Sequence, residues 1–334
     1  MPRTSLGDLT HSYILRRQAT DLKAAAQRLT FEVTTGLVGD TARAVSGDLV
    51  PLAGIETSLT RLQAFRSATT EAGLFASGMQ EALGVLDRLS GDLSTSLVTA
   101  SNSGHAAMIA AVGADAAERF DSAISTLNTR LGDRSLFSGM ATSQPALVSA
   151  ETIMQALDSV VAGTTTAETA AAAVSAWFAS PTGFAAVAYR GGDPMSPLPV
   201  SPEDEVRLEV TALDPTILRM VEGLALGALI DRASAPPTNA ERTTLARLAG
   251  ERLMSGQTDR AGLAARVGTA EARIEAAVQR NDTERSALEL VRAGVLSVDP
   301  YAAASELQAV QSQIEALHAI TARLSRLSLV DFLR

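Results

Sequence analysis

Apolar residues recur at alternating spacings of four and three near both ends of this chain, and this pattern constrains the fold most. An average period of 3.5 residues keeps one apolar seam on a helix and requires a partner helix alongside it. The N-terminal seam consists of Leu15, Ala19, Leu22, Ala26, Leu29 and Val33. It stops at Thr34-Thr35-Gly36, where Gly36 and Gly39 favour a helix end and a turn.

A longer seam follows and predicts a second helix that ends at the loop 101–104. Its apolar members are Ile55, Leu59, Leu62, Phe65, Met79, Leu83, Leu86, Leu93 and Leu97. Thr69 and Ser90 are weaker positions within it. A third helix is expected over residues 114–130, with Phe120, Ile124 and Leu127 on its inner side.

The C-terminal part repeats the four-three alternation in two seams. The first consists of Leu263, Val267, Ala270, Ile274, Ala277, Asn281, Glu284, Leu288, Val291 and Val295. Its two polar members, Asn281 and Glu284, either fix the register of the helices or mark a stretch that faces solvent. Ser297-Val298-Asp299-Pro300 predicts a helix break. The last seam consists of Leu307, Val310, Ile314, Leu317, Leu324 and Leu327.

The middle of the chain has a different composition, because nine of the twelve prolines lie between residues 140 and 237. We expect strands at 184–189 and 206–211, and short helices at 153–161, 167–178 and 216–230. The predicted fold is therefore mostly α: a long antiparallel helical bundle or coiled coil formed by both chain ends, with a small inserted α/β domain. The expected parts are residues 1–139, 140–237 and 238–334, the outer two being halves of the bundle.

Composition excludes several classes of protein. Of the 334 residues, 46% are hydrophobic but only 4% are aromatic, which favours helices over a barrel or sandwich of many short strands. The absence of cysteine excludes disulfides, thiolate metal sites and cysteine nucleophiles. A net charge of −9 argues against binding to nucleic acid.

No motif for catalysis or cofactor binding is present, so we expect neither an enzyme nor a cofactor or metal site. His11, His105 and His318 lie in separate segments. The acidic run 203–205 is typical of a solvated turn, since a general acid needs burial to raise its pKa. Ser138 has no neighbouring base in the sequence that would activate it as a nucleophile.

The terminal helices are the candidate functional surface. A helix whose apolar seam is narrow and contains few large side chains does not fold into a separate domain, and it is not stable in isolation. They either close a monomeric bundle or order when the chain assembles with other subunits, and the second interpretation is favoured. The predicted assembly residues are Leu15, Leu22, Leu29, Val310, Ile314, Leu317, Leu324 and Leu327.

Short motifs also follow one another in a recognisable order. Residues 22–36 end a helix with Thr-Gly, and Gly39-Asp40 precedes the next helix. Residues 127–139 end in Leu136-Phe137-Ser138-Gly139, and residues 189–193 spell Tyr-Arg-Gly-Gly-Asp. These segments resemble the bacterial flagellin family. Flagellin itself usually has Phe-Asn-Gly at the second motif, so Ser138 favours the branch of the family that joins hook and filament.

The C-terminal end continues the resemblance. Residues 265–275 are similar to the family's Gly-x3-Asn-Arg-Leu/Ile-Glu pattern, with Ala272 in place of Asn. Residues 297–302 are similar to its Asp-x-Asp-x-Ala break, with Ser297 in place of the first acid. Residues 327–333 are similar to the closing Ser-Leu-x-Asp-Tyr/Phe-Leu of the junction branch.

The resemblance implies a non-enzymatic, extracellular subunit of the bacterial flagellum at the hook–filament junction. Such a subunit is exported unfolded and uncleaved by the flagellar type III export apparatus and its chaperone. Its implied partners are flagellin, an adjacent hook-associated protein and further copies in a ring, with no membrane insertion. Two alternatives stay open: a flagellin filament subunit, and a cytoplasmic coiled-coil scaffold.

Overall fold

The computed structural model describes residues 6–332 except 46, 235 and 237, and it confirms a mostly α fold. The long helices are α1 (Leu6–Thr35), α3 (Val50–Ser103), α4 (Ala106–Leu127), α10 (Gln257–Leu296) and α11 (Pro300–Phe332). The shorter helices are α2 (Thr41–Ala44), α5 (Ala150–Val161), α6 (Ala167–Ala179), α7 (Phe184–Val187), α8 (Pro215–Ala228), η1 (Leu229–Asp231) and α9 (Asn239–Ser255). The short strands form two antiparallel pairs. In the first, β1 (Arg130–Leu131) pairs with β2 (Arg134–Ser135), and in the second, β3 (Leu198–Pro199) pairs with β4 (Glu205–Val206).

The chain divides into two compact units, each built from both halves of the sequence. The terminal unit comprises residues 1–62 and 282–334, and the inner unit comprises residues 63–281. The helices α3 and α10 contribute residues to both. The division into parts at residues 140 and 237 stays a prediction. No helix in the described part of the chain is long and apolar enough to cross a membrane.

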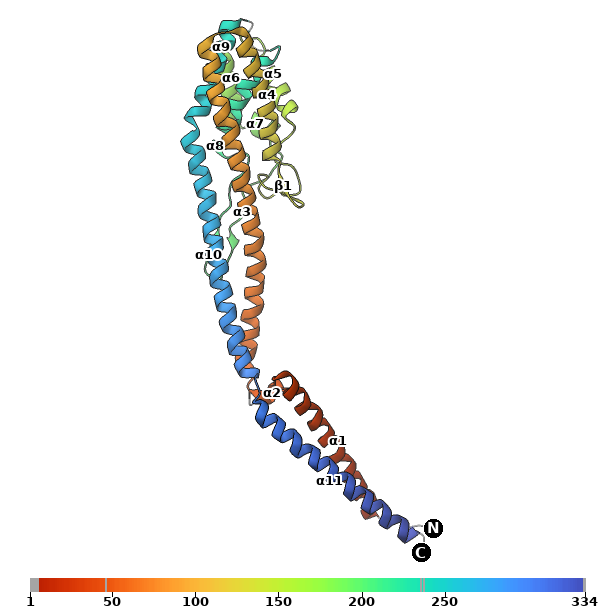
Figure 1. Cartoon of the computed structure of the whole chain (residues 1–334). Coiled ribbons are helices and arrows are strands. Elements are labelled where there is room, and N and C mark those ends of the chain that lie inside the picture. Colours follow the sequence, from red (N-terminus) through yellow and green to blue (C-terminus); the bar gives the residue numbers. More distant parts are fainter. Residues whose placement is uncertain (1–5, 46, 235, 237, 333–334) are drawn as a thin grey trace. The chain divides into compact units, whose positions relative to one another are not determined.

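In the terminal unit, α1 and α11 lie side by side and antiparallel (Figure 1). The segment after α1 meets the segment before α11, where Leu37 and Ser297 form an isolated antiparallel bridge. The expected helix break at residues 297–300 is confirmed, because α10 ends at Leu296 and α11 begins at Pro300.

In the inner unit, α3 packs antiparallel to α10, as the seams predict. Gly73 lies opposite Ile274, and Asp87 accepts a hydrogen bond from Arg260 Nε at 2.8 Å, so the numbering rises on one helix as it falls on the other. Phe65 is half-buried, and the other large seam residues in this unit are buried: Met79, Leu83, Leu86, Leu93, Leu97, Leu263, Val267 and Ile274. Helices α4, α8 and α9 pack against one another and belong to the same connected core.

Polar seam positions on α3 are also buried, and each is satisfied within its own helix. The Thr69 hydroxyl donates to the Phe65 carbonyl at 2.9 Å, and the Ser90 hydroxyl donates to the Leu86 carbonyl at 2.8 Å. Because each hydroxyl bonds a carbonyl one turn earlier, the seam crosses these positions without an unpaired polar group.

The two polar seam positions on α10 have different environments. Asn281 is buried, and its side-chain amide donates to the Val200 carbonyl at 2.8 Å. Glu284 is exposed, as is Val291. Asn281 thus attaches the loop between β3 and β4 to α10, whereas Glu284 belongs to a stretch that faces solvent.

The expected strand at residues 184–189 is wrong, because Phe184–Val187 forms the short helix α7. Phe184 and Ala188 are buried, while Ala186 and Val187 are exposed, so burial follows a spacing of four rather than two. Phe184 stacks on Phe178 of α6 with ring centroids 4.8 Å apart. Packing on α6 therefore overrides the local preference for a strand.

The expected strand at 206–211 is correct at one residue. Val206 pairs with Leu198, but residues 207–211 are in no strand.

The short helices expected at 153–161, 167–178 and 216–230 are confirmed as α5, α6 and α8 with η1. The third long helix, α4, begins eight residues earlier than expected, at Ala106, and ends at Leu127. Gly104, with φ +64°, separates α3 from α4.

Candidate assembly site

The predicted assembly residues lie where α1 and α11 pack on each other. Leu29 and Val310 are 1% and 8% exposed, and Leu15, Leu22, Ile314 and Leu317 are half-buried. The side chains of Leu324 and Leu327 lie outside the described residues. The seams therefore join the two helices within one chain, and their role between subunits stays a prediction.

The terminal unit has almost no core of its own. Its buried apolar side chains among the described residues are Leu29, Leu52, Leu62, Ala303 and Val310. The connected hydrophobic core spans residues 72–277 and lies entirely in the inner unit. Two paired helices bury one stripe each, so most of their surface stays in water.

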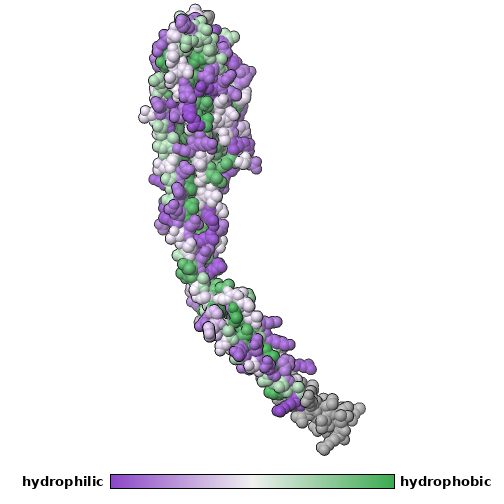
Figure 2. Space-filling model, viewed as in Figure 1, coloured by the Kyte–Doolittle hydropathy of each residue, from purple (hydrophilic) through white to green (hydrophobic). Residues whose placement is uncertain are grey.

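Large apolar side chains are exposed on this same unit. Of the sixteen exposed large hydrophobic residues among those described, ten lie in the terminal unit, although it is the smaller one. Figure 2 shows apolar side chains on the visible face of its helices. The ten exposed residues of the terminal unit are Tyr13, Ile14, Phe31, Leu37, Leu49, Val50, Leu290, Val291, Tyr301 and Ile320.

Nine of these ten residues lie outside the predicted seams, so periodicity does not identify them. Val291 was assigned to a seam but is 53% exposed. Tyr301, which is 90% exposed, and Leu290, which is 75% exposed, fall outside the four-three pattern. In the sequence, such exposed residues are indicated by large hydrophobic residues that fall outside the apolar seam of their helix. A concentration of exposed large apolar side chains on one small unit favours a protein–protein contact there.

Backbone pairing fixes the inner end of α1 against the start of α11. Val38 N–H donates to the Leu296 carbonyl at 2.8 Å, and Val298 N–H donates to the Gly36 carbonyl at 3.0 Å. Gly36 has φ +70°, a conformation that favours glycine. Two motifs that lie far apart in the sequence therefore form one structural element.

A buried carboxylate strengthens this turn. Glu32 is 4% exposed and accepts hydrogen bonds from Arg28 Nη1 at 3.0 Å and from Gly39 N–H at 3.1 Å. A Cβ at Gly39 would lie 2.9 Å from Arg28 Cγ. Charge pairing and a close backbone approach together hold the loop after α1 on that helix.

In the inner unit, two motifs of the sequence analysis also meet. Gly192 N–H donates to the Ser138 carbonyl at 2.9 Å, and Met140 N–H donates to the Asp193 carbonyl at 2.8 Å. Tyr189 donates its hydroxyl proton to the Gly192 carbonyl at 2.8 Å, and burial raises the pKa of Tyr189. The Ser138 hydroxyl is fully buried and makes no hydrogen bond to a described residue.

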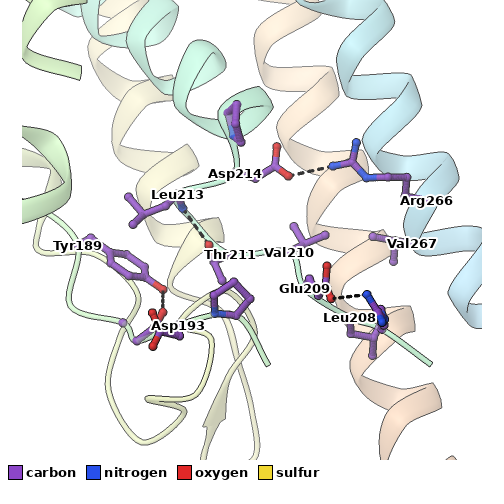
Figure 3. Close-up of a pocket in the computed structure, with 15 residues that line it drawn as sticks. Tyr189, Asp193, Leu208, Glu209, Val210, Thr211, Leu213, Asp214, Arg266 and Val267 are labelled. Carbon is purple, nitrogen blue, oxygen red and sulfur yellow. Dashed lines mark hydrogen bonds and ion pairs between the residues drawn. The ribbon is translucent and has the colours of Figure 1, made fainter. Parts of the chain in front are cut away.

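An open cleft of about 880 Å³ lies beside this junction (Figure 3). Its walls include Tyr189, residues 191–194, residues 207–211 and Arg266 of α10. Arg266 donates to Asp214 at 2.9 Å, so both charges are paired. Asp204, in the acidic run 203–205, is exposed and pairs with Arg280.

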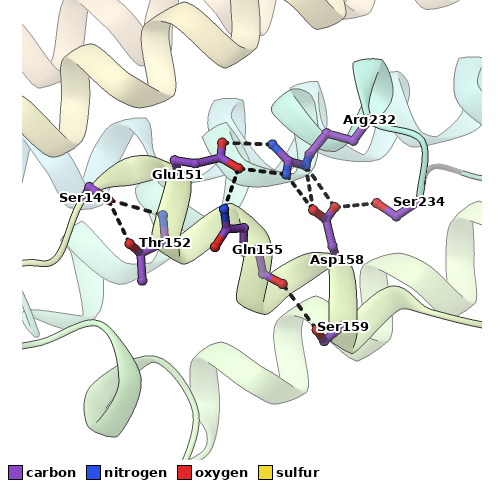
Figure 4. Close-up of polar contacts among 8 residues, drawn as sticks. All are labelled: Ser149, Glu151, Thr152, Gln155, Asp158, Ser159, Arg232 and Ser234. Atoms are coloured by element: carbon purple, nitrogen blue, oxygen red, sulfur yellow. Dashed lines mark hydrogen bonds and ion pairs between the residues drawn. The ribbon is translucent and has the colours of Figure 1, made fainter.

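A polar cluster joins α5 to the segment after η1 (Figure 4). Arg232 donates to Asp158 at 2.6 Å and 2.9 Å, and to Glu151 at 3.2 Å. The hydrogen bonds from Arg232 lower the pKa of Asp158, and the Ser234 hydroxyl lowers it further. The same guanidinium lowers the pKa of Glu151, and the two carboxylates raise the pKa of Arg232. This cluster ties two segments of the inner unit together.

Among the described residues, His, Cys, Asp and Glu form no cluster of three or more that could hold a metal ion. His105 lies immediately before α4, and His318 is exposed on α11. The side chain of His11 lies outside the described residues.

Residues 256–333 match the family model for the bacterial flagellin C-terminal helical region, so the C-terminal part of the chain is flagellin-like. Among solved structures, the chain is similar to one from Vibrio parahaemolyticus described as a flagellar hook-associated protein. The sequence identity is 13%, the TM-score is 0.50, and the match covers 73% of this chain and 96% of that chain. At this identity the likeness shows a shared fold. No curated protein sequence matches the chain.

Proposed function

We infer that this chain is a structural subunit of the bacterial flagellum that forms the junction between hook and filament. In this proposal it is hook-associated protein 3. The chain leaves the cell unfolded through the flagellar type III export apparatus, with a chaperone. Outside, it forms a ring in contact with flagellin and with an adjacent hook-associated protein.

The terminal unit is the observation that carries this proposal. Its helices pair with each other, yet ten large apolar side chains among the described residues of this unit are exposed, and α10 and α11 lie within the flagellin-like region. Covering such side chains with a neighbouring subunit removes apolar area from water at about 25 cal/mol per Å². Assembly through this unit therefore has a driving force that the monomer does not use.

Deletion of the gene tests the junction. We expect cells with complete hooks, no filaments and flagellin released into the medium, and we expect the wild-type gene to restore swimming. A deletion strain with hooks and normal filaments would overturn the proposal.

A second candidate is the filament subunit itself, which the flagellin-like C-terminal region also supports. Immunogold labelling of intact flagella separates the two. Labelling confined to the base of the filament supports the junction, whereas labelling along its whole length supports the filament subunit. A cytoplasmic scaffold is favoured if the protein stays inside swimming cells.

A further inference from the structure

One wall of the cleft in Figure 3 is made by residues 207–211, which directly follow β4. The strands β3 and β4 pair at Leu198 with Val206 and at Pro199 with Glu205. Beyond these pairs residues 207–211 are in no strand, and they line the cleft together with residues 191–194.

The backbone of residues 207–210 has no hydrogen-bond partner within the described part of the chain. The segment nevertheless has the side-chain pattern of a strand. Val206, Leu208 and Val210 are buried in the core, while Arg207 and Glu209 are exposed. An extended segment with unpaired N–H and C=O groups is a template for a strand from another chain.

The sequence of this segment is complementary to itself. In an antiparallel pair of two copies centred on Leu208, Arg207 of each copy lies opposite Glu209 of the other, and Val206 lies opposite Val210. Opposite charges and β-branched pairs are both favourable across antiparallel strands. Within one copy, Arg207 Nη1 is 3.7 Å from Glu209 Oε1, so both charged groups lie on the outer face.

We propose that residues 206–210 form an intermolecular antiparallel strand pair with the same segment of a second copy of this chain. The pairing supplies a protein hydrogen-bond partner to backbone groups of residues 207–210 that have none in the described part of the chain. It involves the inner unit and does not depend on the proposed flagellar role.

Charge reversal in the full-length chain tests the pairing by sedimentation velocity over a concentration series. The wild type is expected to form a dimer. Arg207→Glu places two like-charge pairs in the interface and is expected to weaken the dimer roughly tenfold. The double variant Arg207→Glu with Glu209→Arg is expected to restore it. Arg247→Glu, which breaks the exposed Arg247–Glu251 pair on α9, is the matched control and should leave the dimer unchanged.

The absence of cysteine allows a second readout. A mixture of Arg207→Cys and Glu209→Cys chains is expected to form mainly the mixed disulfide, because these positions face each other in the pair. A monomer at every concentration, a dimer indifferent to Arg207→Glu, or no preference for the mixed disulfide would overturn the proposal. Assembly through the terminal unit would not respond to residues 207 and 209, so the two proposals fail separately.

Discussion

At the scale of single residues, Gly139 holds the contact between the segments 136–139 and 189–193. Its φ is +60°, and a Cβ there would lie 2.2 Å from the Asp193 carbonyl oxygen. Gly132 has nearly the same φ, +58°, but a Cβ there would meet nothing within 4 Å. Alanine substitutions at Gly132 and Gly139 therefore separate the cost of backbone strain from the cost of a steric clash.

We expect Gly132→Ala to lower the free energy of unfolding by about 1–2 kcal/mol through left-handed strain. Gly139→Ala is expected to cost about 3 kcal/mol or more, because the clash adds to the strain. Urea unfolding monitored by circular dichroism measures both. If both variants lost the same free energy of unfolding, the segments 136–139 and 189–193 would move apart without cost.

Asp158 makes the stability of the inner unit dependent on pH. Its folded-state pKa is lowered by Arg232, so the carboxylate form favours the folded state. The contribution is fully present above the unfolded-state pKa of about 3.9 and is lost as the pH falls through the lower folded-state pKa. Partial exposure and solvent screening limit it to roughly 1 kcal/mol.

Asp158→Asn is therefore expected to be less stable than the wild type at pH 7 and equally stable near pH 2. Unfolding midpoints at the two pH values measure this. Glu251→Gln, which breaks an exposed pair on α9, is the control and should change stability by no more than about 0.5 kcal/mol. A deficit of Asp158→Asn that persists at the lower pH would contradict the role of the ion pair.

At the scale of elements, the two polar positions of the α10 seam contribute differently to stability, because Asn281 is buried and hydrogen-bonded whereas Glu284 is exposed. Asn281→Ala leaves the Val200 carbonyl without its donor and is expected to cost about 1–3 kcal/mol. Glu284→Ala removes an exposed side chain and is expected to cost less than about 0.5 kcal/mol. Chemical unfolding of both variants checks the difference. If the two costs were equal, the hydrogen bond would not anchor the hairpin to α10.

The sparse burial of the terminal unit also predicts local opening. In the isolated protein, we expect trypsin to cleave after the exposed Arg16 and Arg17 of α1 well before it cleaves the inner unit. Arg260, which is 8% exposed and bonded to Asp87, is the internal reference for a protected site. Cleavage of both regions at one rate would show that the two units unfold together.

At the scale of the whole molecule, exposed apolar residues are expected to matter for assembly rather than for folding. Tyr301→Asp changes a side chain that is 90% exposed, so the monomer should keep its stability within about 0.5 kcal/mol. Filament attachment should be lost, because buried aromatic anchors dominate many interfaces.

Swimming and electron microscopy of cells that carry the variant measure this effect. Met254→Asp, at a residue that is 55% exposed in the inner unit, is the control and should leave filaments intact. Normal filaments with Tyr301→Asp would exclude Tyr301 from the contact between subunits.

Helical periodicity is local, and that is why the sequence predicted α3, α10 and the break at residues 297–300. The buried residues Leu86, Leu93, Leu263 and Val267 were identifiable because a seam places them on one side of a helix. The same argument predicted that the two ends of the chain need each other. It failed for Phe184, whose conformation depends on its packing against α6.

The sequence by itself thus determined the helices, their seams and the need for partners, because these follow from residues three and four positions apart. Tertiary structure decided which large apolar side chains stay exposed after the seams have packed, among them Tyr301 and Leu290. It also brought Gly192 to Ser138 and left the backbone of residues 207–210 without a hydrogen-bond partner among the described residues. Contacts between distant residues depend on the packing of the whole chain, and neither residue of such a pair carries a local signal of the other.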